Sequence, residues 1–344
     1  MPVMRRADAG AARPTTQSIP PMANPDPVLA HDWHPLVRAE DFSARKVLPA
    51  RLLGEDLVLW TDGGRYHAWR DLCVHRGSRL SLGKVKDGCL QCPYHGWTYN
   101  EAGTCVRIPA HPEQKPPSRA VVTVHSCREA YGWVWGCLSA TPNELPVFPE
   151  WDDASVRNFT MGPYDMEASG PRIIENFLDL AHLPVVHEGI LGVESRSEIG
   201  RYQVEKRPDG VYATDIVVWQ PDPDGSGQPA AAYYTYRVIR PLTAYLTKHA
   251  GSSVFTMMII ATPVDEARSK AWIVFSMKGA DSTPSQQLFD WTERVFLQDK
   301  PVVQSQRPEL LPLDLQAELH LNCDRTSIAY RQWLNELGVG FGTS

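Results

Sequence analysis

The sequence predicts an α+β protein with two domains, in which a small all-β module precedes an antiparallel sheet wrapped by helices. Its 344 residues are enough for two domains of ordinary size. Between residues 46 and 134 the chain consists of short β-rich runs separated by glycine and aspartate turns. From residue 200 to 279 the runs are longer, and segments with helical spacing follow them. A proline-rich stretch at 142–149 separates these two patterns.

We therefore divide the chain into residues 1–28, 29–145 and 146–344. The first part is predicted to be a disordered tail, because it is rich in Pro, Ala, Thr and Arg and has no apolar periodicity. Its arginines also resemble those of a targeting peptide, and Met22 would serve as a second possible start. The second part is the all-β module, and the third is the α+β domain.

Each element is expected where its pattern is strongest. Strands of the first module are predicted at residues 46–52, 56–61, 65–70, 89–91, 98–99, 120–125 and 132–137. Strands of the second domain are predicted at residues 200–206, 211–220, 231–240, 244–250, 253–263 and 270–279. Helices are predicted at residues 173–183, 285–303 and 324–337, the first of them ended by Pro184. Antiparallel strands covered by helices leave room for a pocket.

Composition excludes several classes of function. A net charge of −6 and a pI near 6.0 give no basic face for nucleic acid. The longest apolar run, residues 254–261, has the length of a strand and is too short to span a membrane. The chain has seven cysteines and no recognisable signal peptide, so we interpret the cysteines outside the motif below as reduced thiols in the cytoplasm.

The strongest motif pairs Cys73 and His75 with Cys92 and His95, the two halves being separated by sixteen residues. Two thiolates and two imidazoles are the ligand set of a Rieske [2Fe–2S] cluster, in which two histidines replace two cysteines on one iron. Each half ends in a turn that contains a glycine, and two such turns can close over a cluster. The motif therefore predicts a protein that transfers single electrons.

Zinc is the main alternative at this motif, because two cysteines and two histidines also form tetrahedral zinc sites. Each half here is mixed, with one cysteine and one histidine, which suits two irons better than one zinc. Cys89 and Cys92 form a C-x-x-C pair, the spacing of redox dithiols and zinc knuckles. We interpret Cys89 as a buried strand residue.

A second set of polar residues interrupts an apolar segment. Asn176, Asp179 and His182 are three residues apart, so we expect them along one face of a helix. His187 would not share that face in a continuous helix, but Pro184 distorts the turn and can bring both imidazoles to one metal. Two histidines and one carboxylate form the facial triad of non-heme Fe(II) oxygenases.

The carboxylate must come from elsewhere, and Asp299 near the end of the helix 285–303 is our candidate. Asp290 and Glu293 lie earlier on that helix and are predicted to be solvated. Glu188 adjoins a ligand but points wrongly for a compact triad. Taken alone, the histidine pair could also be a capped helix end or two satisfied core histidines.

Together these motifs resemble those of the Rieske non-heme iron oxygenases. The matching patterns are Cys-x-His-Arg-Gly with Cys-Pro-Tyr-His-Gly-Trp, and Glu-Asn-Phe-x-Asp-x-x-His-x-x-x-x-His. Within the family, the chain looks most like oxygenases related to the methylxanthine N-demethylases and, more distantly, the vanillate and dicamba O-demethylases. Gln298 and Gln304 stand where relatives often have acidic residues. We expect neither to touch a ligand, although both could tune the site.

The resemblance implies a helix-grip catalytic domain, a homotrimer and two metal sites. The cluster would be held by Cys73, His75, Cys92 and His95, and the mononuclear iron by His182, His187 and Asp299. Asp179 would bridge His95 of one subunit to His182 of the next, which makes His95 the exit point of the cluster. Asn176 would lie near the iron without binding it.

The resemblance also implies the activity, that of a terminal oxygenase and most simply a monooxygenase. Electrons from NADH would arrive through a separate reductase of flavin or ferredoxin type, because the chain has no flavin or nicotinamide motif. O₂ would then hydroxylate a small aromatic or heterocyclic substrate or remove its N- or O-methyl group. Two alternatives stay open, namely a Rieske electron carrier whose second domain binds a partner and a zinc-stabilised binding module.

The pocket walls are predicted only in outline. We expect them to come from the strands between Tyr233 and Ile260 and from the helix around Trp291. Met257 and Met258 are interpreted as core residues.

Overall fold

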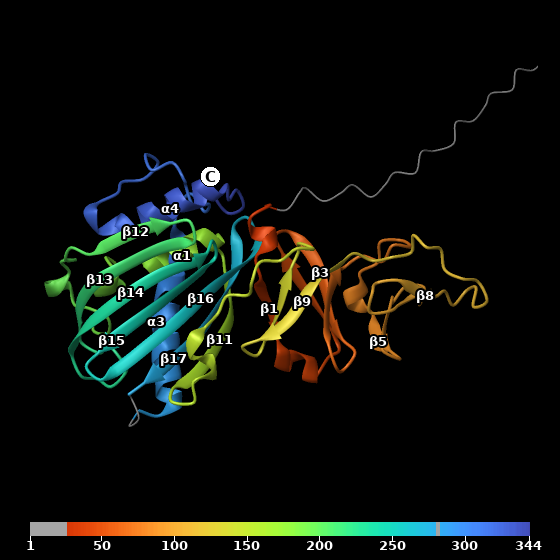
Figure 1. The fold of residues 1–344 in the computed structure, drawn as a ribbon, viewed down its shortest axis with the longest axis horizontal. Helices are drawn as coiled ribbons and strands as arrows, with labels where there is room; N and C mark the ends of the chain where they lie inside the picture. Colours follow the sequence, from red (N-terminus) through yellow and green to blue (C-terminus); the bar gives the residue numbers. More distant parts are fainter. Residues whose placement is uncertain (1–25, 280–282) are drawn as a thin grey trace, which may run out of the picture.

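The fold is taken from a computed structural model, which describes residues 26–279 and 283–344 (Figure 1). The first 25 residues of the predicted tail lie outside the described residues. Asp26 belongs to the folded chain: its carboxylate accepts backbone N–H groups from Gly340 at 2.7 Å and Phe341 at 3.0 Å. The start of the described chain is thus bound to its last segment.

The N-terminal half contains two antiparallel sheets. The larger has six strands in the order β1-β10-β9-β4-β3-β2. Its members are β1 (His34–Arg38), β2 (Val47–Leu52), β3 (Glu55–Thr61), β4 (Tyr66–Arg70), β9 (Val124–Ala130) and β10 (Trp133–Cys137). Between β4 and β9 the chain forms a separate four-stranded sheet of β5 (Lys84–Lys86), β6 (Cys89–Gln91), β7 (Thr98–Tyr99) and β8 (Cys105–Arg107). Figure 1 shows this small sheet at the end of the molecule away from the C-terminal half.

The C-terminal half is built on one seven-stranded antiparallel sheet in the order β11-β17-β16-β15-β14-β13-β12. Its strands are β11 (Arg157–Met166), β12 (Gln203–Arg207), β13 (Gly210–Gln220), β14 (Ala230–Arg240), β15 (Thr243–Ala250), β16 (Ser253–Asp265) and β17 (Arg268–Lys278). The α-helices are α1 (Gly170–Leu178), α2 (Leu183–Val186), α3 (Ser285–Ser305) and α4 (Arg325–Leu337). Short 3₁₀ turns occur at Leu29–His31, Ala39–Ser43, Leu80–Leu82, Pro149–Asp152, Glu194–Arg196 and Asn322–Asp324.

Figure 1 shows α1 and α3 against the same face of this sheet, with α4 along its β12–β13 edge. The predicted fold class, an all-β domain followed by an antiparallel sheet with helices, is confirmed. Among the described residues, no helix has the length and apolarity needed to cross a membrane.

The two halves pack through β1 and β2 against β16. Thr262 donates its hydroxyl proton to the Pro35 carbonyl at 2.6 Å, and the Leu53 N–H donates to the Pro263 carbonyl at 2.8 Å. Nearby, the rings of Trp133 and Trp272 lie 5.3 Å apart in a shared buried cluster. Hydrogen bonds and apolar burial therefore both join the sheets.

One predicted helix is wrong in its extent. Residues 173–183 were expected to be helical, but α1 ends at Leu178. The next residue, Asp179, takes an extended backbone, and its carboxylate accepts the N–H groups of Ala181 at 2.9 Å and His182 at 3.3 Å. Such side-chain bonds compete with the helix. Pro184 then stands in the first turn of α2, where its missing N–H costs nothing.

The other long elements follow the prediction to within about three residues, with one exception. Residues 120–125 were expected to form a strand, but β9 begins only at Val124. Four strands were not predicted from the sequence: β1, β5, β8 and β11.

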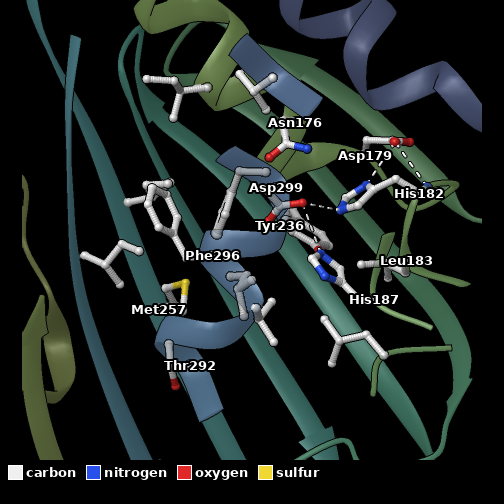
Figure 2. Close-up of a pocket in the computed structure, with 18 of the residues that line it drawn as sticks. Asn176, Asp179, His182, Leu183, His187, Tyr236, Met257, Thr292, Phe296 and Asp299 are labelled. Carbon is white, nitrogen blue, oxygen red and sulfur yellow. Dashed lines mark hydrogen bonds and ion pairs between the residues drawn. The ribbon is translucent and has the colours of Figure 1, made fainter. Parts of the chain in front are cut away.

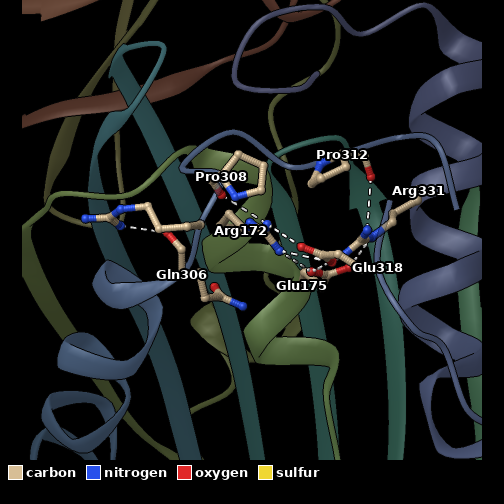
Figure 3. A network of polar contacts seen from close by, with 8 residues as sticks. Arg172, Glu175, Gln306, Pro308, Pro312, Glu318 and Arg331 are labelled. Carbon is tan, nitrogen blue, oxygen red and sulfur yellow. Dashed lines mark hydrogen bonds and ion pairs between the residues drawn. The ribbon is translucent and has the colours of Figure 1, made fainter. Parts of the chain in front are cut away.

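A buried network of charges holds α1 in place (Figure 3). Arg331 on α4 makes a bidentate pair with Glu175 on α1, with Nε to Oε1 at 2.6 Å and Nη2 to Oε2 at 2.9 Å. Glu318 accepts hydrogen bonds from both Arg331 and Arg172. The carbonyl group of Pro308 accepts a further hydrogen bond from Arg172, and that of Pro312 accepts one from Arg331. Two arginines and two glutamates cancel in charge, so the network can be buried without an uncompensated ion.

We predict that Arg331→Met lowers the free energy of unfolding by about 3–5 kcal/mol, because it leaves Glu175 buried without its bidentate partner. Denaturant unfolding monitored by circular dichroism measures the change. Arg207→Met is the matched control, since Arg207 pairs with Glu205 on the surface and such pairs contribute about 0–1 kcal/mol. Equal effects of the two substitutions would show that the network does not stabilise the fold.

Candidate metal centres and cavity

The first candidate centre is built by two similar turns. One joins β4 to β5 and carries Cys73, and the other joins β6 to β7 and carries Cys92. In each turn the cysteine carbonyl accepts the N–H of the glycine four residues on, Gly77 at 2.9 Å and Gly96 at 3.2 Å. Both glycines have positive φ, +67° and +69°, which other residues rarely adopt. The structure therefore forms the two glycine turns that the motif predicts.

The two thiols of these turns lie together in the interior. Cys73 and Cys92 are 1% and 2% exposed. A hydrogen bond with Cys92 lowers the pKa of Cys73 to about 5, and the hydroxyl of Tyr99, 3.1 Å from the Cys73 sulfur, also contributes. Thiolate is the form in which cysteine binds metal. The same hydrogen bond raises the pKa of Cys92, so one thiolate is favoured in the absence of metal and a bound cation would displace the proton of the second thiol.

The two imidazoles lie beside the thiols at the surface end of the turns. The rings of His75 and His95 are 4.5 Å apart. His75 stacks on Trp97 at 4.4 Å with an interplanar angle of 7°, and its Nδ1 is buried without a hydrogen-bond partner among the described residues. His95 is exposed and lies against Tyr94 at 3.8 Å. Of the two, His95 is the ring that a second molecule can reach.

The second candidate centre joins the chain after α1 to the end of α3 (Figure 2). Nε2 of His182 lies 3.4 Å from Oδ1 of Asp299, and Nε2 of His187 lies 3.1 Å from the same oxygen. One possible ligand atom from each residue falls within 4.8 Å of the others. Oδ1 of Asp299 is buried yet receives no well-directed hydrogen bond within the described residues. An acceptor left free between two imidazoles suits a bound cation.

The charges around this centre favour ionised carboxylates. Burial opposes the charged form of His182, but the hydrogen bond to Asp179 and the nearby Asp299 outweigh it and raise the pKa of the imidazole to about 9. Burial likewise opposes ionisation of Asp299, but the two histidines outweigh it and lower the pKa of that carboxyl. A cation with two positive charges would replace the proton between these groups.

Each histidine is oriented by a second hydrogen bond from its other nitrogen. Nδ1 of His182 lies 3.0 Å from Oδ2 of Asp179. Nδ1 of His187 lies 3.0 Å from Oε1 of Gln298. The expectation that Gln298 touches no ligand is therefore wrong. Gln298 and Asp299 are neighbours on α3, and they contact the two different nitrogens of the same ring, that of His187. Gln304 instead accepts the backbone N–H of Glu167 at 3.1 Å.

The remaining carboxylates stay outside the centre. Glu188 and Asp290 are exposed, as expected. Glu293 is partly exposed, and one of its carboxylate oxygens accepts a hydrogen bond from Tyr164 at 2.7 Å. Asn176 lines the cavity, and its side chain makes no hydrogen bond to the centre within the described residues. Cys89 lies in β6, half-buried, as a strand residue.

The second centre opens onto a cavity between α3 and the large sheet. Its lining is mostly aliphatic and aromatic, and the strands and α3 supply most of it, as predicted. Met257 lines the cavity, so its interpretation as a core residue is wrong, whereas Met258 is fully buried in the core. The sequence does not single out the other polar lining groups, which include Lys248 and Tyr236. A metal beside such a cavity could act on a small apolar substrate.

Two family models match the chain, one in each half. Residues 32–126 match the family model of the Rieske [2Fe-2S] domain, and residues 166–339 match that of the vanillate O-demethylase oxygenase C-terminal domain. Methylxanthine N1-demethylase NdmA of Pseudomonas putida is 33% identical over 323 residues, which cover 90% of this chain and 89% of that protein.

The structure of NdmA of Pseudomonas putida with caffeine superposes with a TM-score of 0.80 at 31% identity, over 90% of this chain and 91% of that one. A shorter match, 42% identical over 131 residues, is to oxidoreductase NdmD of Pseudomonas putida. It covers 37% of this chain and 22% of that protein.

We predict that Gln298→Leu weakens the binding of Fe(II) roughly ten- to hundredfold, because His187 loses the group that orients its ring. Competition with a coloured Fe(II) chelator under anaerobic conditions measures the affinity. Gln304→Leu on the same helix is the control, since the Gln304 side chain accepts the backbone N–H of Glu167 and does not bond to His187. Unchanged affinity in Gln298→Leu would exclude an orienting role.

Proposed function

The chain belongs to the Rieske non-heme iron oxygenases with a vanillate O-demethylase-type catalytic domain, and on this basis we propose that it removes methyl groups oxidatively from small aromatic or N-heterocyclic molecules. The observation that carries the proposal is the convergence of His182, His187 and Asp299 at the wall of an apolar cavity. Such a set of two histidines and one carboxylate leaves coordination positions open for reactants.

We assign one cofactor to each centre, and the residues present fit both. Cys73, His75, Cys92 and His95 would hold the [2Fe–2S] cluster, because they supply two buried thiols and a buried, unpartnered imidazole nitrogen. His182, His187 and Asp299 would hold the mononuclear iron, because the free Asp299 oxygen lies between the two imidazoles. When bound, these cofactors supply single-electron transfer and O₂ activation.

The side chains around the second centre would prepare it for this chemistry. Asp179 holds the Nδ1 proton of His182, and Gln298 accepts that of His187, so both Nε2 atoms face Asp299. The aromatic side chains of Phe177 and Phe296 line the cavity and limit its water. Binding in such a cavity places a methyl group of the substrate beside the triad.

The reaction balances with NADH as the source of two electrons. The methyl group, one O₂ molecule and two electrons with two protons give a hydroxymethyl group, which takes one oxygen atom, and one water, which takes the other. The hydroxymethyl group on nitrogen or oxygen then breaks its bond to that atom and leaves as formaldehyde. The sequence contains no nicotinamide motif, and part of the chain is similar to oxidoreductase NdmD. We therefore propose that a separate flavin- or ferredoxin-type reductase supplies the electrons, in the reducing cytoplasm.

We further propose a homotrimer in which the two centres of one reaction come from two subunits. Figure 1 shows the small sheet that carries the first centre at the opposite end of the molecule from α3. Both regions expose apolar side chains: Leu82 and Tyr94 beside the first centre, and Val302 and Leu319 around the depression that Asp179 lines. Such patches favour contact between subunits. Asp179 would then link His182 to His95 of the neighbour.

Iron analysis tests the cofactor assignment. The intact protein is expected to hold about three iron atoms per chain, and His182→Ala about two, with the visible spectrum of the cluster unchanged. The same protein with a surrogate reductase and NADH should release formaldehyde from methylated aromatics or alkaloids. Two iron atoms in the intact protein, with no loss in His182→Ala, would instead favour an electron carrier.

Asp179→Asn tests the proposed link between subunits. It should keep both metal sites filled and abolish turnover, because a neutral amide cannot support transfer between His95 and His182. Iron content and formaldehyde release are measured on the same sample. Asp290→Asn on the exposed face of α3 is the control. Turnover at the wild-type rate in Asp179→Asn would refute the role of this carboxylate.

A further inference from the structure

A lysine is buried in the wall of the apolar cavity. Lys248 lies on β15, is 3% exposed and lines the same cavity as His182 and His187. Taking an ammonium group out of water costs several kcal/mol unless it is paired. A lysine placed here without a partner is therefore a candidate for binding.

The ammonium group of Lys248 has no counter-ion within the described residues. It makes no hydrogen bond or ion pair there and instead lies over three aromatic rings, with Nζ 4.9 Å from the ring centre of Trp291, 5.2 Å from Phe255 and 5.5 Å from Tyr234. These rings stabilise a cation only in part. The indole N–H of Trp291 is also buried without an acceptor among the described residues.

The nearest acidic residues are engaged elsewhere. Asp224 accepts hydrogen bonds from Ser226 and Ser253, and Asp222 accepts the backbone N–H of Gly227 at 2.8 Å. Burial lowers the pKa of Lys248 to about 7, and the two aspartates offset only part of that effect. An anion that enters the cavity would therefore raise the pKa of the Lys248 ammonium group and keep it protonated.

The sheet sets how far Lys248 lies from the metal centre. Tyr236 pairs with Leu246 across β14 and β15, and Tyr234 pairs with Lys248. The pair of Tyr236 and Leu246 is the one beside the triad, because Tyr236 lies next to Asp299 and His187 in the cavity wall (Figure 2). The pair of Tyr234 and Lys248 is two residues farther along, about 7 Å. One substituted aromatic ring can span that distance.

We propose that Lys248 is a specificity-determining residue that binds an anionic oxygen of the substrate, so that this protein takes aromatic methyl ethers or N-methyl heterocycles carrying a carboxylate. A carboxylate supplies the missing counter-charge and accepts hydrogen bonds from Nζ, whereas a neutral ring leaves the ammonium unpaired. The ion pair would hold one end of the substrate ring while its methyl group lies at His182, His187 and Asp299. This inference rests on the proposed demethylation for the reaction that follows binding.

The test compares two probes of nearly equal shape and different charge. Binding of 4-methoxybenzoate and of 4-methoxybenzamide to the intact, iron-loaded protein is measured by titration calorimetry, and the 3-methoxy isomers are measured in the same way. The wild type should bind the acid roughly ten- to hundredfold more tightly than the amide, and Lys248→Met should reduce that ratio to about one. Lys270→Met, whose side chain pairs with Asp165 at the surface, should keep the wild-type ratio.

Two results would overturn the inference: a wild type that does not prefer the acids, and a Lys248→Met variant that keeps the preference. Formaldehyde release by the wild type is scored separately. A wild type that prefers the acids but releases no formaldehyde would contradict the demethylation and leave the role of Lys248 intact. Formaldehyde release without any preference for acids would support the demethylation and contradict the role of Lys248.

Discussion

The bidentate pair between Arg331 and Glu175 is the constraint on which the catalytic half depends. It fastens the last turn of α1 to α4, and the next residue, Asn176, already lines the cavity. Because α1 cannot shift along the sheet, the turn that follows it must begin at Asp179. That turn delivers His182 and, after α2, His187 to the end of α3. The buried ion pair between α1 and α4 thus positions the two histidines, and this positioning does not require a bound metal.

Both centres show how a protein prepares for cations before they bind. In the first, one thiol already favours its thiolate because the other donates to it. In the second, two carboxylates keep a proton on His182 that a metal would replace. In each case one imidazole is fixed from behind, by stacking on Trp97 or by Gln298. Rigid support of this kind limits the rearrangement needed for electron transfer.

Residue types, spacing and the family resemblance were sufficient to predict the fold class, and His182, His187 and Asp299 were named before the structure showed that they lie together. Asp299 could be chosen because it lies near the end of the long predicted helix, in a segment that resembles the family. Spacing failed where side chains compete with the backbone: Asp179 ends α1 by accepting two N–H groups, which a helical pattern does not reveal. It failed also for Met257, Gln298 and Lys248, because which neighbours share a strand face or helix turn depends on register. A lysine in a β-rich run is ordinarily on the surface, and only the pairing of β14, β15 and β16 shows otherwise.

The alternation of side chains along β15 has a consequence for how this cavity could change in evolution. Only every second residue of a strand faces the cavity, so Leu246 and Lys248 are the available positions for a charge on this strand. Moving the charge therefore changes its reach in steps of about 7 Å and never by less. Substitutions on the strand therefore change the distance between the charge and the metal centre in large steps. Smaller changes in that distance must come from α3, whose residues advance by about 1.5 Å each. New substrates of slightly different length would accordingly be accommodated by changes on the helix, while the strand sets their class.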